Sequence, residues 1–402
     1  MKNPLKQTLE QNSILREAEQ AGVKLDEILC QHGWTYDDLR YESNIEISGN
    51  EKLSNAKYVT LNDLRKKNHK VPVVSFFSGA GGLDLGFESA GFSHDALVEV
   101  NPIFCSTLRY NRPQWTVIGP PLDNGDVSNF ENICLTLEQR GVSIDYPGVF
   151  IGGPPCQPFS IAANQRFSKN DVNFKRVGFS HEKNGNLLFD YIRLILKFRP
   201  AAFLVENVVG LIDVDNGVQL NKAIELLTEN GYTVEKPLIL NAANYLVPQN
   251  RNRMFLVGNR LNKSFIEPEP SEQLVPCGVA LKGNMNLLPN HVTRKHQISS
   301  IVRYVKLPLG GRDKLGRVDR LDPLLPSKTV IAGGASGGGR SHLHPMIPRT
   351  LSVRESARLQ TFPDDYEFLG THSRQFTQVG NAVPPVLAAQ LAWQFYVSFF
   401  DK

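Results

Sequence analysis

The chain has 402 residues, of which 41 % are hydrophobic, enough for a globular protein with two domains or with one large domain and an insert. No apolar run approaches the roughly 18 residues of a membrane span, and none follows the first lysines as in a secretory signal, so we expect a cytoplasmic protein. Five scattered cysteines without a Cys-x-x-Cys pair argue against a disulfide framework and a zinc cluster, so we expect reduced thiols and no metal.

The net charge of +4 is distributed unevenly along the chain. Residues 259–345 contain 13 Lys and Arg against 6 Asp and Glu, so this segment carries +7 and the remainder sums to −3. A concentrated positive field suits a polyanion, because neutralising phosphates releases counterions. The alternative is a solvated basic face without a partner.

The first 70 residues have apolar positions at roughly helical spacing, interrupted at Gly22 and Gly33. They hold 11 basic and 11 acidic residues. A helix-turn-helix regulator is conceivable, but zero net charge favours a packing or positioning appendage. Residues 66–70 have the composition of a linker.

From Val71 onward, short β-rich runs alternate with helical stretches, which is the pattern of an α/β domain with a mainly parallel sheet. Glycines at 91, 141 and 231 are placed to end helices. The pattern predicts strands at 72–77, 95–99, 148–152, 202–206 and 252–257, and helices at 83–90, 102–110, 128–140, 186–198 and 218–230.

The alternation fades between about 259 and 345, where proline, glycine and basic residues predominate, so we expect a second, loop-rich unit. Helical patterns resume at 351–359 and 384–399, and the last can return to the first domain. The predicted segments are therefore 1–70, 71–258, 259–345 and 346–402.

Cys156 follows a predicted buried strand at 149–151 that Gly152-Gly153-Pro154-Pro155 ends abruptly, which predicts a cysteine in a loop at the carboxyl end of a strand. Glu206 also follows an apolar strand. If the two strands are parallel, both side chains emerge at the same rim of the sheet, where ligands of α/β proteins bind. A thiolate and an acid would then share one substrate, whereas a lone cysteine is otherwise often structural.

A glycine turn at 76–83 ends the first predicted strand, and such turns let a backbone approach a nucleotide-like cofactor. Asp84 stands where a dinucleotide fingerprint needs its third glycine, so hydride transfer is disfavoured. Carboxylates follow at Glu99, at the end of the second strand, and in a Gly125-Asp126-Val127 turn. Taken singly these acids suit a cap or a turn, but the ordered set suggests an adenosine-bearing, cationic ligand such as S-adenosylmethionine.

Gln249-Asn250-Arg251-Asn252-Arg253 places two arginines at period two near the start of another strand. This spacing aims Arg251 and Arg253 at the same face, where they can hold an anion or a substrate carbonyl.

Six motifs stand in order along the chain: Phe77-x-Gly79-x-Gly81-Gly82, Pro155-Cys156-Gln157, Glu206-Asn207-Val208, Gln249-x-Arg251-x-Arg253, Arg354-Glu355 with Arg358-Leu359-Gln360-x-Phe362-Pro363, and Gln378-x-Gly380-Asn381-Ala382-Val383. Together they resemble the DNA (cytosine-5) methyltransferases of bacterial restriction–modification systems. The similarity covers 72–258 and about 326–395 and leaves the amino-terminal segment and most of the basic unit unmatched. It implies a Rossmann-like S-adenosylmethionine-dependent domain with a mainly parallel sheet, a smaller loop-rich target-recognition domain and a helical amino-terminal extension.

The resemblance implies covalent catalysis on a cytosine ring. The Cys156 thiolate would add at carbon 6 and make carbon 5 enamine-like. Glu206 would act at ring nitrogen 3, which requires a raised pKa, while Arg251 would hold the base carbonyl with Arg253 in support. The cofactor residues that the resemblance implies are Phe77, Gly79, Ala80, Gly82, Glu99, Asp126, Val127 and, in closing the pocket, Asn381.

A carbon within stacked DNA is inaccessible to a pocket, so the target base has to be flipped out. Residues 160–186 fit a mobile loop for this step, although a disordered surface loop is the alternative. Its basic residues are Arg166, Lys169, Lys175, Arg176 and Lys183. The basic unit at 259–345 would read the sequence. The candidate readers are Arg294, Arg303, Arg312, Arg317 and Arg340.

The expected partner is double-stranded DNA, with a monomeric enzyme protecting it from a cognate restriction endonuclease or acting as a solitary counterpart. Three alternatives stay open: a transfer-RNA methylating relative with the same motifs, a dinucleotide-dependent oxidoreductase, and a DNA-binding module that has lost catalysis. The sequence assigns neither the recognition site nor a role for residues 1–70.

Overall fold

The computed structural model describes residues 4–43, 51–155, 187–332 and 342–401. The chain forms two compact units, each assembled from separate stretches of sequence. Unit 1 comprises Met1–Tyr58, Val247–Asn250 and Leu274–Asn381, and unit 2 comprises Val59–Leu246, Arg251–Gln273 and Ala382–Lys402.

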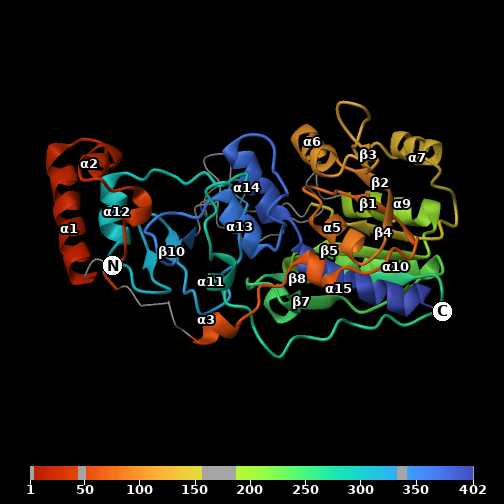
Figure 1. The fold of residues 1–402 in the computed structure, drawn as a ribbon. Helices are drawn as coiled ribbons and strands as arrows, with labels where there is room; N and C mark the ends of the chain where they lie inside the picture. The colour runs from red at the N-terminus through yellow and green to blue at the C-terminus, as the bar shows by residue number, and fades with distance from the viewer. Residues whose placement is uncertain (1–3, 44–50, 156–186, 333–341, 402) are drawn as a thin grey trace. The chain divides into compact units, whose positions relative to one another are not determined.

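Unit 2 is built on an eight-stranded sheet in the order β3-β2-β1-β4-β5-β8-β6, with β7 also paired to β8 (Figure 1). The first five strands in this order are mutually parallel, whereas β6 and β7 both pair antiparallel with β8, as β8 does with β5. The strands are β1 (Pro72–Phe76), β2 (Ser93–Val98), β3 (Val117–Ile118), β4 (Val149–Gly152), β5 (Ala202–Asn207), β6 (Thr233–Val234), β7 (Leu238–Asn241) and β8 (Asn252–Asn259).

Helices of unit 2 alternate with the strands, as the sequence predicts. Asn101 caps the start of α6 by accepting hydrogen bonds from Ile103 N–H and Phe104 N–H, and glycines lie just beyond the ends of α5, α7 and α10. The helices of this unit are α4 (Leu61–Leu64), α5 (Gly82–Ser89), α6 (Pro102–Asn111), α7 (Phe130–Gln139), α9 (Leu187–Phe198), η4 (Val209–Leu211), η5 (Val214–Gly217), α10 (Val218–Glu229), η6 (Ala242–Tyr245), α15 (Pro385–Phe395) and η7 (Tyr396–Phe400).

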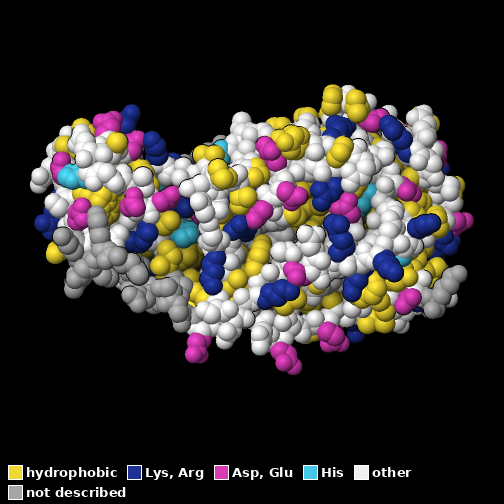
Figure 2. Space-filling model, viewed as in Figure 1, with side chains coloured by type: hydrophobic (Ala, Val, Ile, Leu, Met, Phe, Trp, Pro, Cys, Tyr) yellow, Lys and Arg dark blue, Asp and Glu magenta, His cyan; other side chains and the backbone are white. Residues whose placement is uncertain are grey.

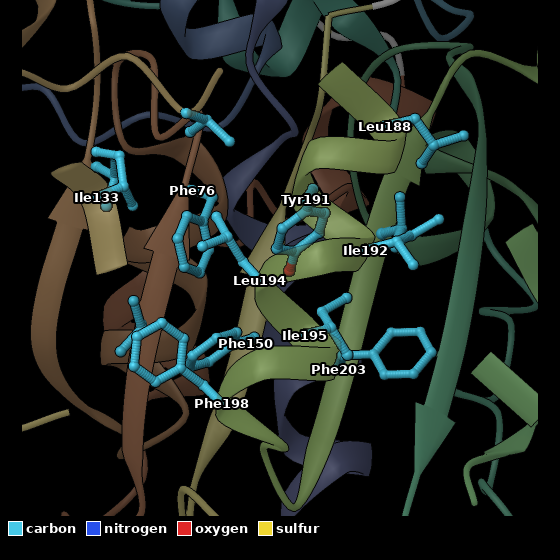
Figure 3. Packing of buried hydrophobic residues seen from close by; sticks show 14 of the residues in the cluster. Phe76, Ile133, Phe150, Leu188, Tyr191, Ile192, Leu194, Ile195, Phe198 and Phe203 are labelled. Carbon is cyan, nitrogen blue, oxygen red and sulfur yellow. The ribbon is translucent and has the colours of Figure 1, made fainter. Parts of the chain in front are cut away.

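A single hydrophobic cluster joins α7, α9 and α10 to one face of the sheet. Figure 3 shows side chains of α9 beside strand residues of this cluster. The Tyr191 ring lies 5.1 Å from the ring of Phe76, which itself lies 5.1 Å from the ring of Phe150. These buried aromatic contacts fix the sheet whose carboxyl-end rim carries the candidate site.

The carboxyl-terminal helix α15 belongs to unit 2 and packs on α5. Gly86 permits this approach, because a Cβ atom built there would lie only 2.3 Å from Cβ of Ala388. The helix that follows the glycine turn is therefore packed against α15.

Unit 1 combines the 18-residue helix α1 and several shorter helices with a three-stranded sheet in the order β11-β10-β9. A capping box between Ser352 and Glu355 begins α13. Its elements are α1 (Pro4–Ala21), α2 (Leu25–Gln31), η1 (Tyr36–Asp38), α3 (Glu51–Asn55), α11 (Cys277–Ala280), α12 (Ile298–Tyr304), β9 (Arg312–Asp313), β10 (Val318–Arg320), β11 (His342–Leu343), α13 (Val353–Leu359) and α14 (His372–Asn381).

The mixed α/β class and the mostly parallel sheet are confirmed, and the five predicted strands and helices of unit 2 all form. The short strands β3, β6 and β7 and the helix α14 were not predicted. The four predicted domain segments stay a prediction. Within the described ranges, no helix is long and apolar enough to cross a membrane.

Candidate active site

The turn after β1 has a backbone that bends sharply before α5. Phe77, Gly79 and Gly81 have φ angles of 55°, 57° and 75°, in the left-handed region that favours glycine. Phe77 adopts it without being glycine, so its conformation is held by its surroundings. Ala80 is buried, and Gly82 begins α5. The turn thus bends the backbone directly before the amino end of a helix.

Glu99 ties this turn to the end of β2. Its carboxylate accepts hydrogen bonds from Gly79 N–H and Asn101 N–H, both at 2.7 Å. Burial raises the pKa of Glu99, and the backbone N–H groups oppose that shift. Each carboxylate oxygen keeps a second lone pair for another donor.

The loop from 119 to 126 packs directly on the end of β2. Cβ atoms built at Gly119 and Gly125 would lie 2.1 and 2.0 Å from the Glu99 carbonyl oxygen, so only glycine fits at both positions. Arg109 holds the start of this loop, donating to carbonyl oxygens of residues 117, 119 and 120. Nothing in the sequence pattern signalled this role of Arg109.

Asp126 forms an Asx-type turn in the same loop. Its Oδ1 accepts hydrogen bonds from Ser128 N–H at 3.0 Å and from Ser128 Oγ at 2.7 Å. The next residue, Val127, is buried. Part of the Asp126 carboxylate therefore shapes the turn, which is the structural role that the sequence left open.

Glu206, near the end of β5, forms an ion pair with Arg253 of β8. The distance from Arg253 Nε to Glu206 Oε1 is 2.9 Å, and the two side chains are 14 % and 12 % exposed. Burial raises the pKa of Glu206, while the charges of Arg253 and Arg251 act in the opposite direction. The result is an acid of raised pKa beside two guanidinium groups.

Arg251 directly precedes β8 and is 1 % exposed. Burial and the neighbouring Arg253 lower its pKa, and Glu206 opposes this shift. A guanidinium nevertheless stays protonated in proteins, so both arginines are cations at this rim. Both arginines act to lower the pKa of Glu206, and their predicted role in one site stays a prediction.

The strand ends that lead to Cys156 and Glu206 are parallel neighbours, with Gly152 opposite Val205. A Cβ atom built at Gly153 would lie 2.8 Å from Glu206 Oε2. Asn207 Nδ2 donates to the Pro154 carbonyl oxygen at 3.3 Å. The chain leading to Cys156 thus runs against the Glu206 carboxylate, whereas Cys156 itself lies outside the described residues.

Asn381, the remaining cofactor candidate, ends α14 in unit 1 and is exposed. The preceding Gly380 leaves no space for a side chain, because its Cβ atom would lie 2.2 Å from Ala332 N. Its predicted part in closing the cofactor pocket stays a prediction.

Several candidate DNA contacts have partners within unit 1. Arg303 Nε lies 3.2 Å from Asp313 Oδ1, and Arg312 Nη1 lies 2.9 Å from Asp319 Oδ2. On the face drawn in Figure 2, basic side chains are interspersed with acidic ones. Arg294 is exposed. The candidates Arg166, Lys169, Lys175, Arg176, Lys183 and Arg340 lie outside the described residues.

Arg317 lies in the turn between β9 and β10 with a φ angle of 53°. Within the described ranges, no group of three or more His, Cys, Asp or Glu side chains is arranged to hold a metal ion.

Comparison with known proteins shows to which family the chain belongs. The profile of the C-5 cytosine-specific DNA methylases matches residues 71–396. The chain belongs to this family. It is a DNA cytosine-5 methyltransferase of the bacterial restriction–modification type, and the resemblance found in the motifs is confirmed.

Curated relatives of this methyltransferase include the Type II methyltransferase M.PspPI of Psychrobacter sp. (strain TA137), 34 % identical over 347 residues that cover 79 % of this chain and 76 % of the relative. The Type II methyltransferase M1.HphI of Haemophilus parahaemolyticus is 33 % identical over 338 residues, with coverage of 79 % and 85 %. These relatives support a DNA substrate for the family's reaction.

A solved E. coli structure, assigned as a prophage-encoded DNA modification methyltransferase, matches with a TM-score of 0.67 and 25 % identity, covering 83 % of this chain and all of that one. The methyltransferase EhMeth of Entamoeba histolytica, at 16 % identity and a TM-score of 0.57, covers 82 % of this chain and 99 % of its own and shares the fold.

Proposed function

We propose that the enzyme methylates carbon 5 of a cytosine within a specific duplex DNA sequence, using S-adenosylmethionine and a flipped target base. The observation that carries the proposal is the acid of raised pKa, Glu206, held by Arg253 beside the backbone that leads to Cys156. An acid near a nucleophile is what addition to an electron-poor ring requires.

The chemistry assigns a separate task to each residue. The Cys156 sulfur bonds to carbon 6 of the ring, and the electron pair that moves through the ring is stabilised at nitrogen 3 by a proton or hydrogen bond from Glu206. Arg251 holds the base carbonyl, and Arg253 keeps the Glu206 carboxyl in place. After methylation, loss of the carbon 5 proton expels the cysteine sulfur and restores the aromatic ring.

The residues around the turn after β1 fit S-adenosylmethionine, which supplies an electrophilic methyl group when bound. Glycines in the turn would let its backbone approach the ligand, and Phe77, which belongs to this turn, would contact the adenine ring. Glu99 retains lone pairs for ribose hydroxyls, and Asp126 borders the same loop. The further candidates for contact with the cofactor are Ala80, Gly82, Val127 and Asn381.

We propose that the hairpin formed by β9 and β10 contributes to DNA recognition. Its turn carries Lys314, Leu315 and Arg317, and the Leu315 side chain is 77 % exposed. Asp313 stiffens the turn by accepting a hydrogen bond from Gly316 N–H at 2.8 Å. Cations and an apolar group at a rigid tip suit phosphates and base edges. Because Arg303 and Arg312 are paired with carboxylates, Arg317 is the stronger candidate reader.

Bisulfite sequencing of DNA from a methylation-free host that expresses the chain tests this function. The expected result is complete methylation of one cytosine in one recurring sequence, and none with Cys156→Ala. Methyl incorporation into transfer RNA but not into duplex DNA would contradict the proposal. Survival of the methylated DNA in a restriction digest would support a protective role beside a cognate endonuclease.

A further inference from the structure

The amino-terminal residues precede the family match, which begins at residue 71, yet they form part of the core of unit 1. Ile14, Leu29 and Leu39 belong to one hydrophobic cluster with Ile301 of α12 and Val318 of β10. Figure 1 shows α1 and α2 next to α12. The extension is therefore built into the unit that carries the β9–β10 hairpin.

Tyr41 makes the most specific of these contacts. It is 1 % exposed, and the carbon at the centre of the Arg320 guanidinium lies 3.6 Å from the centroid of its ring. The Tyr41 hydroxyl donates to the His344 carbonyl oxygen at 2.8 Å. Two residues later, Ser43 Oγ accepts a hydrogen bond from Arg320 Nη1 at 2.9 Å.

Arg320 depends on these contacts because it is a buried cation whose hydrogen-bond partners are neutral groups. It is 1 % exposed and donates to the carbonyl oxygens of Leu307 at 2.6 Å and Pro345 at 3.0 Å. Among the residues that the structure describes, no carboxylate lies within ion-pair distance of it. A desolvated guanidinium over an aromatic face is a strong cation–π arrangement, so Tyr41 stabilises a charge whose hydrogen-bond acceptors, two backbone carbonyl groups and the Ser43 hydroxyl, are all neutral.

The position of Arg320 connects this contact to the hairpin. Arg320 is the last residue of β10, and its backbone N–H donates to the Gly311 carbonyl oxygen at 2.8 Å, directly before β9. β9 and β10 pair antiparallel through Val318–Asp313 and Asp319–Arg312. Arg320 therefore anchors the base of the hairpin whose turn carries Lys314, Leu315 and Arg317.

We propose that Tyr41 is a positioning residue for target recognition: through Arg320, the amino-terminal extension fixes the β9–β10 hairpin and thereby sharpens the choice of DNA sequence. This inference rests on the proposed function of the hairpin. It gives residues 1–43 a role in the choice of DNA sequence, while the proposed catalytic residues belong to unit 2.

The alternative is that the extension only stabilises unit 1. Loss of stability lowers the amount of active enzyme equally for all DNA sequences, whereas a displaced hairpin changes the ratio between sequences. The discriminating quantity is therefore the ratio of methylation at the preferred site to methylation at sites that differ from it by one base pair.

The test is bisulfite sequencing of plasmid DNA methylated by purified full-length Tyr41→Leu, Tyr41→Phe and wild-type enzymes at equal active concentration. We expect Tyr41→Leu to lower the ratio at least tenfold and to leave S-adenosylmethionine affinity within twofold. Tyr41→Phe keeps the ring over Arg320 and should stay within threefold of wild type. A ratio for Tyr41→Leu within twofold of wild type would overturn the inference.

Tyr232→Leu is the matched control, because Tyr232 of unit 2 is also buried and donates to a backbone carbonyl, that of Pro200 at 3.0 Å. It should lose stability without a change in the ratio, and an equal fall in both variants would contradict the proposal. If Tyr41→Leu does not fold, Arg320→Lys carries the same test, with a fall of at least threefold expected and an unchanged ratio overturning the inference. A wild-type enzyme that methylates no DNA would refute the proposed function itself.

Discussion

The two units are stabilised by different means. In unit 2, apolar strands such as β4 and β5 satisfy their backbone through sheet hydrogen bonds and bury apolar side chains between helices. In unit 1, much of the chain is irregular, and buried arginines donate to its carbonyl groups. Arg354, for example, is fully buried and donates to the carbonyl oxygens of residues 289, 363 and 366.

This difference shows that arginine has several distinct uses in one chain. Arg253 pairs with the buried Glu206, Arg320 and Arg354 donate to backbone carbonyl groups in unit 1, and Arg317 lies in an exposed turn. Buried polar groups need partners, and a loop-rich unit supplies carbonyl acceptors that a sheet already uses. Positive charge in unit 1 is therefore not by itself a measure of DNA contact.

The largest expected effect tests whether the catalytic acid is Glu206 of unit 2. Glu206→Gln keeps the side-chain shape and removes the acid, so we expect kcat to fall by about 10²–10⁴-fold. Single-turnover methylation of duplex DNA measures the change, and calorimetry should show S-adenosylmethionine affinity within twofold of wild type. A kcat within fivefold of wild type would remove Glu206 from the mechanism.

A second substitution tests the buried charges of unit 1. Arg349 forms a bidentate pair with Glu355, both bonds at 2.9 Å, and each side chain is 3 % exposed. Glu355→Gln removes the buried anion and leaves the Arg349 guanidinium with only the half-exposed Asp37, whose Oδ1 lies 3.3 Å from Arg349 Nε, so we expect the free energy of unfolding to fall by about 3–5 kcal/mol.

Asp364→Asn provides the control, because Asp364 pairs with Arg358 at 2.7 Å but is 42 % exposed. Its loss should cost less than about 1 kcal/mol. Denaturant unfolding followed by a probe in unit 1 measures both values. Equal losses for the two variants would mean that burial does not distinguish these ion pairs.

The pH dependence of stability offers a third test of the same unit. Burial lowers the pKa of His344 to about 4, and its Nδ1 accepts hydrogen bonds from Met346 N–H and Ile347 N–H, which requires an unprotonated nitrogen. Below its ordinary value of 6.5 the unfolded chain takes up a proton that the folded chain does not. Stability should therefore fall by about 3 kcal/mol as pH drops from 6.5 to 4.

Glu355 should extend this loss at lower pH. Although burial opposes the shift, the charge and hydrogen bonds of Arg349 lower the pKa of Glu355 to about 2. Its stabilising contribution is present above its ordinary pKa of 4.5 and declines as pH falls toward 2. His344→Asn retains an acceptor without the titration, so a fall between pH 6.5 and 4 as steep as in wild type would contradict the assignment to His344.

The smallest expected effect tests the close contact between Gly153 and the Glu206 carboxylate. In Gly153→Ala the new methyl group would lie 2.8 Å from Glu206 Oε2, so one of the two groups has to move. We expect kcat/KM for DNA to fall about tenfold, since misplacing a catalytic group by a fraction of an ångström slows the reaction. An unchanged kcat/KM, with Tm also unchanged, would show that the added methyl group is accommodated without displacing Glu206.

The sequence predicted unit 2 well because its elements are local and periodic. The apolar runs at 149–152 and 202–206 are strands, and their parallel pairing brings Glu206 to the chain that leads to Cys156. The direction of β8 was not predictable, since an apolar run has the same composition whether it pairs parallel or antiparallel.

Unit 1 was harder to predict because its contacts join distant stretches. The composition of residues 259–345 gave no sign that Asp313 and Asp319 pair with Arg303 and Arg312, which were predicted to read DNA. Nor did the spacing of apolar residues near the amino terminus indicate that Tyr41 lies against Arg320. Such contacts depend on tertiary structure, and periodicity records only local structure.

Covalent trapping tests the central claim most directly. A duplex that carries 5-fluorocytosine at the preferred site cannot lose a proton from carbon 5 after methylation, so the sulfur bond to carbon 6 persists. We predict a denaturant-resistant complex that requires S-adenosylmethionine and maps to Cys156 by peptide mass spectrometry, with none from Cys156→Ala. Equal trapping by Cys156→Ala, or full methylation activity in that variant, would contradict the account.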